Sequence, residues 1–385
     1  MKVLKMNKSI SAYNNGDLEL PKDATFLHLS PFQPGHLFGG AIRSSETIRM
    51  IKELYPNSYT IHCWNILLEE KPMPSFLAGH RDVLSDVKML YIDFKVELYL
   101  ERIPDVVIFD HPWLWNEAKK IKKMFPHCKV IHSSQNIEWE LKQDLLDKLD
   151  KDVSDKVINL VKEVEIEIAN EADLVVCVTD YDKEWFVANG ATNVIAANNG
   201  TTIKMSQVES GLKYALTVGS GHPPNVSGSK KYLNDAINWL PRDTDLMFVG
   251  GMCDGLRGAL GEERDENKNS TIRFLGGRTN EELAKLIQSA SVIVLPIPYG
   301  GGSNLKTAEA LVSGRPIVGT TVSFRGFKEF MNAENVIVTD DIEEFHNEVV
   351  NFCNKKLPTI KRKGIDSLSW EATFTEFIDY ITYKN

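Results

Sequence analysis

Short apolar segments recur along the second half of this chain at intervals of about 20–30 residues, with helical patterns between them. Five of these segments are typical of buried strands: 214–219, 245–250, 271–275, 291–295 and 316–320. Strands that alternate with helices form parallel sheets covered by helices on both faces. The second half is therefore predicted to be an α/β domain built on one parallel sheet.

The first half of the chain shows the same alternation. Its candidate strands are 25–29, 59–63, 88–92, 104–111, 129–132, 173–178 and 194–197. A glycine-bearing loop after the first of them and a helix over 41–54 resemble the start of a Rossmann-like unit. The 385 residues are enough for two domains with sizeable cores. We expect an α/β protein with two Rossmann-like domains.

One stretch, 298–311, combines a turn rich in glycine with the start of a helix. It follows the predicted strand 291–295, and its three consecutive glycines let the backbone approach a ligand closely. Ser303 is a suitable N-cap for the helix, and Gly314 is a suitable stop. The pattern predicts a strand, a tight loop and a helix that begins at Ser303.

The first turn of this helix carries a cation where acids are usual. Lys306 stands there, and no acid precedes Glu309. A cation opposes the helix dipole at a cost of about 0.3–1 kcal/mol, but an anion bound over the helix start would reverse that cost. A phosphate group is the natural candidate for the anion. The alternative that stays open is an ordinary strand–helix turn with a solvated lysine.

This stretch resembles the donor-site signature of GT-B glycosyltransferases, in particular the retaining family four, also called group 1. The resemblance implies that the loop and helix start hold the diphosphate of a UDP- or GDP-linked sugar, and that Glu309 holds the ribose. The implied diphosphate-binding residues are Gly301, Gly302, Ser303, Asn304, Leu305 and Lys306. The nucleotide sugar would be a substrate, and no further cofactor is expected.

The sequence departs from the family pattern at two places. The family often carries a second glutamate eight positions before the ribose ligand, where this chain has Gly301. Many relatives also place an arginine or lysine pair in the loop after the first strand of the second domain. Residues 219–225 contain no arginine, and only Lys230 and Lys231 follow further on. These departures leave open how the donor sugar is gripped and whether the protein is catalytic.

The first half supplies candidate residues for the other side of a cleft. His111 follows an apolar run at the carboxyl end of a predicted strand, the edge where ligands bind in parallel sheets. The resemblance implies that His111 acts near the reacting carbon of the donor sugar, and that Gly39 and Gly40 face the cleft and the acceptor. Asn136 follows another strand and is a candidate acceptor contact. The alternatives are a structural histidine and a simple tight turn.

Charge and cysteine content argue against several classes of protein. The net charge of −9 argues against nucleic acid as a main partner. The five cysteines form no Cys-x-x-Cys pair, so we expect neither a disulfide framework nor a metal site. We see no signal peptide and no membrane-spanning run, and we predict a cytoplasmic protein. Four lysines in the predicted helix 116–125 leave open a contact with the inner face of a membrane, beside the simpler interpretation of a solvated surface.

These features lead to one functional prediction. Residues 1–205 would form an acceptor-side domain and 206–368 a nucleotide-sugar domain, joined by a linker at 201–212, with a helix at 369–385 packing back on the first domain. The protein would transfer a sugar with retention to a hydroxyl of a glycan, lipid-linked or small-molecule acceptor, in polysaccharide or glycan synthesis. The alternatives are a GT-B protein that binds a nucleotide or partner without catalysis, and a nucleotide-sugar epimerase.

Overall fold

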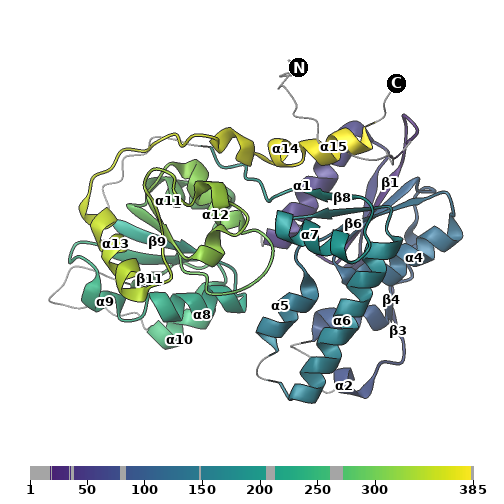
Figure 1. The fold of residues 1–385 in the computed structure, drawn as a ribbon, viewed down its shortest axis with the longest axis horizontal. Coiled ribbons are helices and arrows are strands. Elements are labelled where there is room, and N and C mark those ends of the chain that lie inside the picture. The colour runs from purple at the N-terminus through teal and green to yellow at the C-terminus, as the bar shows by residue number, and fades with distance from the viewer. Residues whose placement is uncertain are drawn as a thin grey trace.

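The chain forms two α/β halves that lie side by side (Figure 1). The computed structural model describes residues 18, 20–33, 35, 39–78, 84–146, 149–204, 213–260 and 272–382. Most of the predicted linker, 205–212, lies outside these residues, as does the end of the predicted last helix, 383–385.

Each half is built on a six-stranded sheet in which all pairings are parallel. The first sheet has the order β2-β1-β5-β6-β7-β8 and the second has the order β11-β10-β9-β12-β13-β14. The first consists of β1 (Phe26–Ser30), β2 (Tyr59–His62), β5 (Val106–Asp110), β6 (Lys129–Ser133), β7 (Leu174–Cys177) and β8 (Val194–Ala196). The second consists of β9 (Tyr214–Val218), β10 (Asp245–Val249), β11 (Ile272–Phe274), β12 (Val292–Leu295), β13 (Ile317–Gly319) and β14 (Val336–Val338). The predicted fold class is confirmed.

Helices cover both faces of each sheet. In the first half they are α1 (Gly39–Leu54), α2 (Ser75–Ala78), α3 (Ser85–Lys88), α4 (Trp115–Met124), α5 (Glu138–Leu145), α6 (Lys151–Glu171) and α7 (Asp180–Ala188). In the second half they are α8 (Pro223–Tyr232), α9 (Ala236–Trp239), α10 (Met252–Leu260), α11 (Asn280–Ser289), α12 (Leu305–Ser313) and α13 (Ile342–Asn354). A small antiparallel pair, β3 (Glu69–Glu70) and β4 (Ile92–Asp93), lies apart from the sheets.

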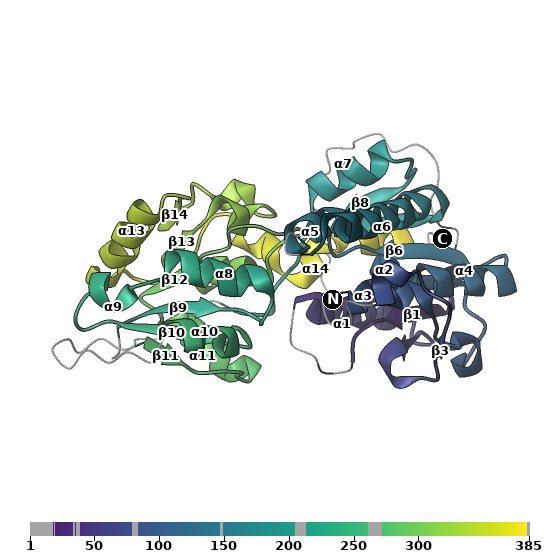
Figure 2. The ribbon, with the colours of Figure 1, turned by 90° about the horizontal axis from the view of Figure 1, so that it is seen from below.

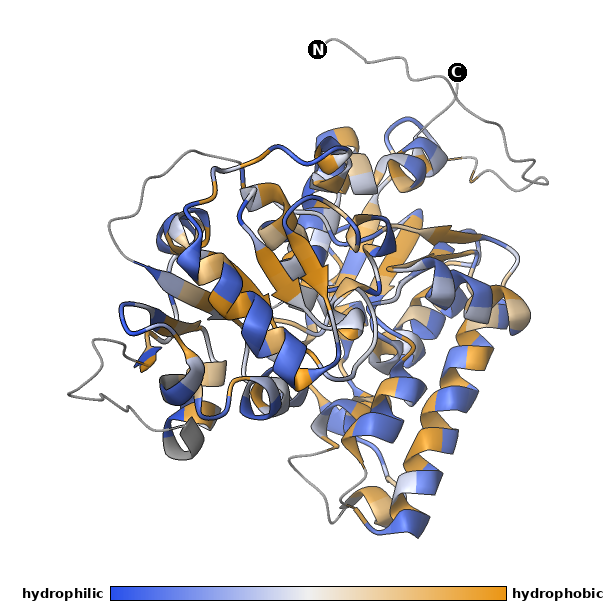
Figure 3. Ribbon diagram, turned by 60° about the vertical axis from the view of Figure 1, so that its left-hand side comes forward, coloured by the Kyte–Doolittle hydropathy of each residue, from blue (hydrophilic) through white to orange (hydrophobic). Residues whose placement is uncertain are grey.

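The apolar strands of both sheets are buried between these helices, whose outer faces are polar (Figure 3). The long helix α6 shows the pattern most clearly, since Val157, Val161 and Ile168 recur on its inner face. Continuous apolar strands and one-sided helices are what a parallel sheet with two covered faces requires.

The last segment of the chain returns to the first half. It ends in α14 (Trp370–Thr373) and α15 (Thr375–Ile381), and Figure 2 shows α14 at the junction of the two halves. Trp370, Phe374, Phe377 and Ile381 are buried in one cluster with Phe26 and other side chains of the first half. Each such side chain contributes about 1.5–3 kcal/mol by leaving water, so this segment ties the halves together.

Two predictions about elements are wrong. Residues 88–92 are not a strand, because α3 and a 3₁₀ turn at Met89–Tyr91 occupy most of them. Leu84, Val87 and Leu90 are buried at three-residue spacing, which is a helical period. The second sheet also has a sixth strand, β14, which was not predicted.

Candidate functional site

A cavity of about 720 Å³ lies between the two halves, at the carboxyl ends of both sheets. The strand order reverses between β9 and β12 in the second sheet: strands after β9 are added on one side, and strands from β12 onward on the other. The same reversal occurs between β1 and β5 in the first sheet. Loops that follow all four strands line the cavity. Ligands of open α/β sheets bind at such switch points, and here two of them face one another.

The second half presents the predicted glycine loop to this cavity. Gly300 and Gly302 have φ angles of 124° and 62°, conformations that favour glycine. Within the described residues, no backbone N–H in 299–306 donates a hydrogen bond. These amides and the start of α12 form a ready site for an anion.

The predicted N-cap is wrong by one residue. Asn304, not Ser303, is the N-cap of α12, and its side chain makes no capping bond. The Asn304 side-chain amide instead donates to the Ser323 carbonyl at 3.2 Å, and the Thr307 hydroxyl donates to the same carbonyl at 2.7 Å. The helix start is thus held by the turn after β13 while its own amides stay unpaired. The predicted stop is confirmed, because Gly314 caps the helix with φ 74°.

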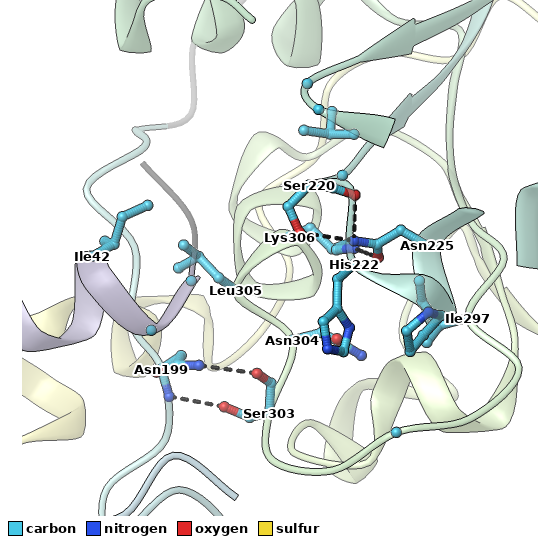
Figure 4. A pocket seen from close by; sticks show the side chains of 18 of the residues that line it. Ile42, Asn199, Ser220, His222, Asn225, Ile297, Ser303, Asn304, Leu305 and Lys306 are labelled. Atoms are coloured by element: carbon cyan, nitrogen blue, oxygen red, sulfur yellow. Dashed lines mark hydrogen bonds between the residues drawn. The ribbon is translucent and has the colours of Figure 1, made fainter. Parts of the chain in front are cut away.

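Ser303 joins the two halves. Its hydroxyl accepts a hydrogen bond from the Asn199 backbone N–H at 3.1 Å, and its carbonyl accepts one from the Asn199 side chain at 2.9 Å (Figure 4). Asn198 adds a bond to the Gly326 carbonyl at 2.8 Å. These contacts fix the glycine loop against the end of β8.

Gly301 and Gly302 lie directly against the first half. A Cβ at Gly302 would come within 2.4 Å of the Gln135 carbonyl oxygen, so a side chain there forces a shift. A Cβ at Gly301 would lie 3.2 Å from the Asn136 side chain. The structure therefore brings predicted Asn136 next to the predicted loop. It also gives a reason for the departure at Gly301, where a glutamate would crowd Asn136.

Lys306 and Glu309 both line the cavity from α12 and are half-buried. The Lys306 ammonium donates to the Asn225 side chain, which in turn bonds to Ser220 in the loop after β9 (Figure 4). Within the described part of the chain, the Glu309 carboxylate accepts no hydrogen bond. Burial lowers the pKa of Lys306 to about 8 and raises the pKa of Glu309 to about 7, against their mutual attraction.

Arg325 is a cavity residue that the sequence analysis missed. It follows the 3₁₀ turn Thr321–Phe324 and donates to the Gly301 and Gly302 carbonyls. Its third nitrogen, Nη1, is buried without a partner, and burial lowers the pKa of the guanidinium to about 10. The arginine absent from 219–231 has a spatial counterpart here. The sequence signal that could have identified Arg325 is its place just after the predicted strand 316–320.

His111 faces the glycine loop from the first half and lines the same cavity. Its φ of 61° is rare for a residue other than glycine and marks a constrained position. Its Nδ1 lies 3.0 Å from a Glu138 carboxylate oxygen, which also accepts from the Asn136 side chain at 3.1 Å. Burial disfavours a charged ring, but the bond to Glu138 outweighs it and raises the pKa of His111. The same bond, against burial, lowers the pKa of Glu138.

Gly39 and Gly40 line the cavity too, but as the first residues of α1 and not as a loop. A Cβ at Gly40 would lie 3.0 Å from the Phe32 ring, while none of the described atoms lies within 4 Å of one at Gly39. All predicted site residues except Gly302 thus line one cavity from their own elements, and Gly302 lies against Asn136 across it.

The lysines of α4 lie away from this cavity and are mostly paired. Lys119 bonds to Glu167 at 2.6 Å, and Lys122 lies 3.7 Å from Asp173. Lys120 contacts Glu97 at 2.8 Å and two further acids, Asp93 and Glu117. The three acids around Lys120 therefore already hold a cation, and the helix carries less free positive charge than its sequence indicates.

Among the described residues, none of the helices is long and apolar enough to cross a membrane.

Comparison with known proteins places this geometry in context. Residues 213–355 match the model of the family described as "Glycosyl transferases group 1". A search of curated proteins gives no match.

Solved structures match nearly the whole chain. Sucrose-phosphate synthase from Thermosynechococcus elongatus aligns with a TM-score of 0.65 and 14% identity over 92% of this chain and 97% of its own. The α,α-trehalose 6-phosphate synthase from Burkholderia multivorans aligns with a TM-score of 0.60 and 10% identity, over 94% and 96%. Anabaena HepE in complex with UDP-glucose aligns with a TM-score of 0.59 and 15% identity, over 93% and 97%.

At such low identity these structures establish the fold, and the family match concerns the second half. Residues 213–355 are similar to the group 1 glycosyl transferases, and the chain as a whole has the GT-B fold.

Proposed function

We propose that this protein transfers a sugar from a nucleotide sugar to an acceptor hydroxyl, with retention at the anomeric carbon, as in glycosyltransferase family four. The observation that carries the proposal is the run of amides at 299–306, which have no acceptor among the described residues, with Lys306 beside it at the switch point of the second sheet. This arrangement suits a diphosphate. The match to group 1 glycosyl transferases over this same half supports it.

Each side chain has a distinct role in the proposal. The amides of the glycine loop and Lys306 hold the diphosphate and stabilise the charge that develops as it leaves. The buried, unpaired Nη1 of Arg325 supplies a second positive contact. Glu309, one turn deeper and free of hydrogen bonds among the described residues, accepts from the ribose hydroxyls. HepE was solved with UDP and with UDP-glucose, so UDP is the first nucleotide to test.

His111 lies on the opposite wall, where the donor sugar would emerge from the loop. The hydrogen bond that Nδ1 donates to Glu138 fixes the ring, which leaves Nε2 for a contact with the sugar in this proposal. The catalytic role of His111 in this proposal is to contact the donor sugar in the transition state. A part in glycan or polysaccharide synthesis and a cytoplasmic location belong to the same proposal.

The direct test is release of nucleoside diphosphate from UDP- and GDP-sugars with and without an acceptor mixture. Release that depends on acceptor supports transfer, and NMR of the new anomeric proton reports retention. Binding of the nucleotide without turnover would instead indicate a non-catalytic protein. Isomerised sugar nucleotide formed without acceptor would indicate an epimerase.

A further inference from the structure

A second cavity, of about 480 Å³, opens from the first half beside the donor cavity. His111, Asn136 and His222 line both cavities, so an occupant of the second would meet the donor sugar at His111. We infer that this second cavity is the acceptor site and that its acceptor is an uncharged saccharide. The inference rests on the proposed transferase function and names the substrate class on its acceptor side.

The walls of the second cavity carry aromatic rings suited to a sugar face. Trp64 lies in the 3₁₀ turn Cys63–Asn65 after β2, and 53% of its surface is exposed. Phe32 and the buried Trp113 line the same space. An aromatic ring gives a large, rigid apolar surface at small entropic cost. The C–H face of a pyranose is an apolar surface of matching size, whereas an extended lipid needs no flat platform.

Two acids and their partners stand among the polar groups that line this cavity. Glu138 and Asp86 contribute carboxylates, of which Glu138 is 4% exposed and Asp86 37% exposed. Carboxylates accept hydrogen bonds from hydroxyl groups and orient a polyhydroxyl ligand. They repel a phosphate or a carboxylate on the ligand.

Among the described residues that line this cavity, Lys142 and His111 are already engaged with acids. Lys142 is 3% exposed, contacts Asp86, and lies 5.3 Å from the centre of the Trp113 ring. His111 is held by Glu138. An anionic acceptor would have to take Lys142 from Asp86 and leave that acid unpaired beside it, which costs free energy. The described residues of the donor cavity are arranged differently: Lys306 donates to the neutral Asn225 side chain, and the amides of 299–306 have no acceptor.

The inference is tested by ligand-observed NMR and calorimetry on the full chain saturated with UDP or GDP, whichever binds. The probes are methyl glycosides of glucose, galactose, mannose and N-acetylglucosamine, the matching disaccharides, and the 6-phosphates of the same monosaccharides. We expect at least one neutral saccharide to bind about tenfold more tightly than its 6-phosphate. Tighter binding of the phosphosugars, or no binding of any neutral saccharide to the nucleotide-loaded protein, would overturn the inference.

Variants locate the binding. Trp64→Ala should weaken the neutral saccharide about tenfold, whereas Trp64→Phe, which keeps a ring, should weaken it far less. Tyr181→Ala is the matched control, since Tyr181 is an exposed aromatic residue (57%) outside both cavities. Equal binding by Trp64→Ala and wild type would contradict the site.

Asp86→Asn adds a test of the charge argument. It frees Lys142 from its carboxylate partner and should narrow the preference for neutral sugar over 6-phosphate. An unchanged preference would contradict the charge argument. Nucleotide affinity measured in the same samples separates the two proposals. If the wild-type protein binds no nucleotide, the transferase assignment fails. If it binds nucleotide but prefers phosphosugars, only this inference fails.

Discussion

The two halves share an architecture but differ in how their polar groups are paired. On the second half, the amides of 299–306 and Arg325 Nη1 have no hydrogen-bond partner among the residues that the structure describes. On the first half His111 is paired with Glu138, and Lys142 with Asp86. Unpaired buried donors cost free energy unless a ligand satisfies them. In the functions proposed above, this difference suits the second half to an anion and the first to a neutral partner.

The largest expected effect concerns the anion side. Lys306→Ala removes a charge-assisted contact worth about 1.5–3 kcal/mol, which corresponds to roughly a 10- to 150-fold loss of nucleoside diphosphate affinity. Nucleoside alone should bind almost as before. Calorimetry measures both, with Lys230→Ala, an exposed lysine outside the cavity, as control. Equal losses for nucleoside and diphosphate would break the comparison.

His111→Ala tests the opposite wall. The variant should lower turnover about 10- to 100-fold, because it removes a contact made mainly in the transition state. Its affinity for nucleoside diphosphate should stay near wild type, since the amide run lies on the other half. Steady-state kinetics and calorimetry give the two values, with the surface histidine variant His127→Ala as control. A well-folded His111→Ala that loses nucleotide affinity would place His111 in the anion site.

Glu309→Gln should have a smaller, less selective effect. It keeps the shape but loses the charged acceptor for ribose hydroxyls, so nucleoside and diphosphate should weaken alike by about 1.5 kcal/mol. The measurement is the same calorimetric pair, with Glu343→Gln on the exposed surface of α13 as control. Weakening confined to the diphosphate would move Glu309 from the ribose to the phosphate region.

The affinity for the donor should depend on pH through the titration of both Glu309 and Lys306. The pKa of Glu309 is raised to about 7, so its carboxylate is charged above pH 7. The pKa of Lys306 is lowered to about 8, so its ammonium is charged below pH 8. Affinity for a nucleotide sugar, whose phosphates stay ionised, should therefore be greatest between about pH 7 and 8 and fall several-fold on either side. Glu309→Gln should remove the acid limb and Lys306→Ala the alkaline limb. A flat profile in wild type would contradict these roles.

The smallest expected effect is at the lysines of α4. Since Lys119, Lys120 and Lys122 lie beside acids, we expect little added binding to anionic vesicles. Co-sedimentation with phosphatidylserine vesicles measures it. Salt-sensitive binding that Lys119→Ala and Lys123→Ala abolish would support the membrane contact left open by the sequence.

The sequence predicted most where the signal is local. The glycine loop, Lys306 and Glu309 follow one another within a strand–loop–helix unit, so their grouping needs no tertiary information. The carboxyl end of a strand placed His111 correctly on a cavity wall.

What the sequence could not supply depends on contacts between distant segments. Arg325 reaches Gly301 from 24 residues away, and Glu138 reaches His111 across 27 residues. The local pattern does not distinguish Glu138 from other glutamates, and for Arg325 it offers only a place after a predicted strand. The Ser303 hydroxyl, predicted as a cap, is used instead by Asn199, 104 residues earlier. Tertiary packing decided each of these cases.

The central claim is that the unpaired wall of the second half binds the diphosphate of a nucleotide. Isothermal calorimetry of UDP and GDP, with uridine and guanosine beside them, tests it most directly on wild type and Lys306→Ala. The account predicts that at least one diphosphate binds one-to-one and far more tightly than its nucleoside, and that Lys306→Ala abolishes most of this difference. Failure of both diphosphates to bind the folded wild-type protein would contradict it.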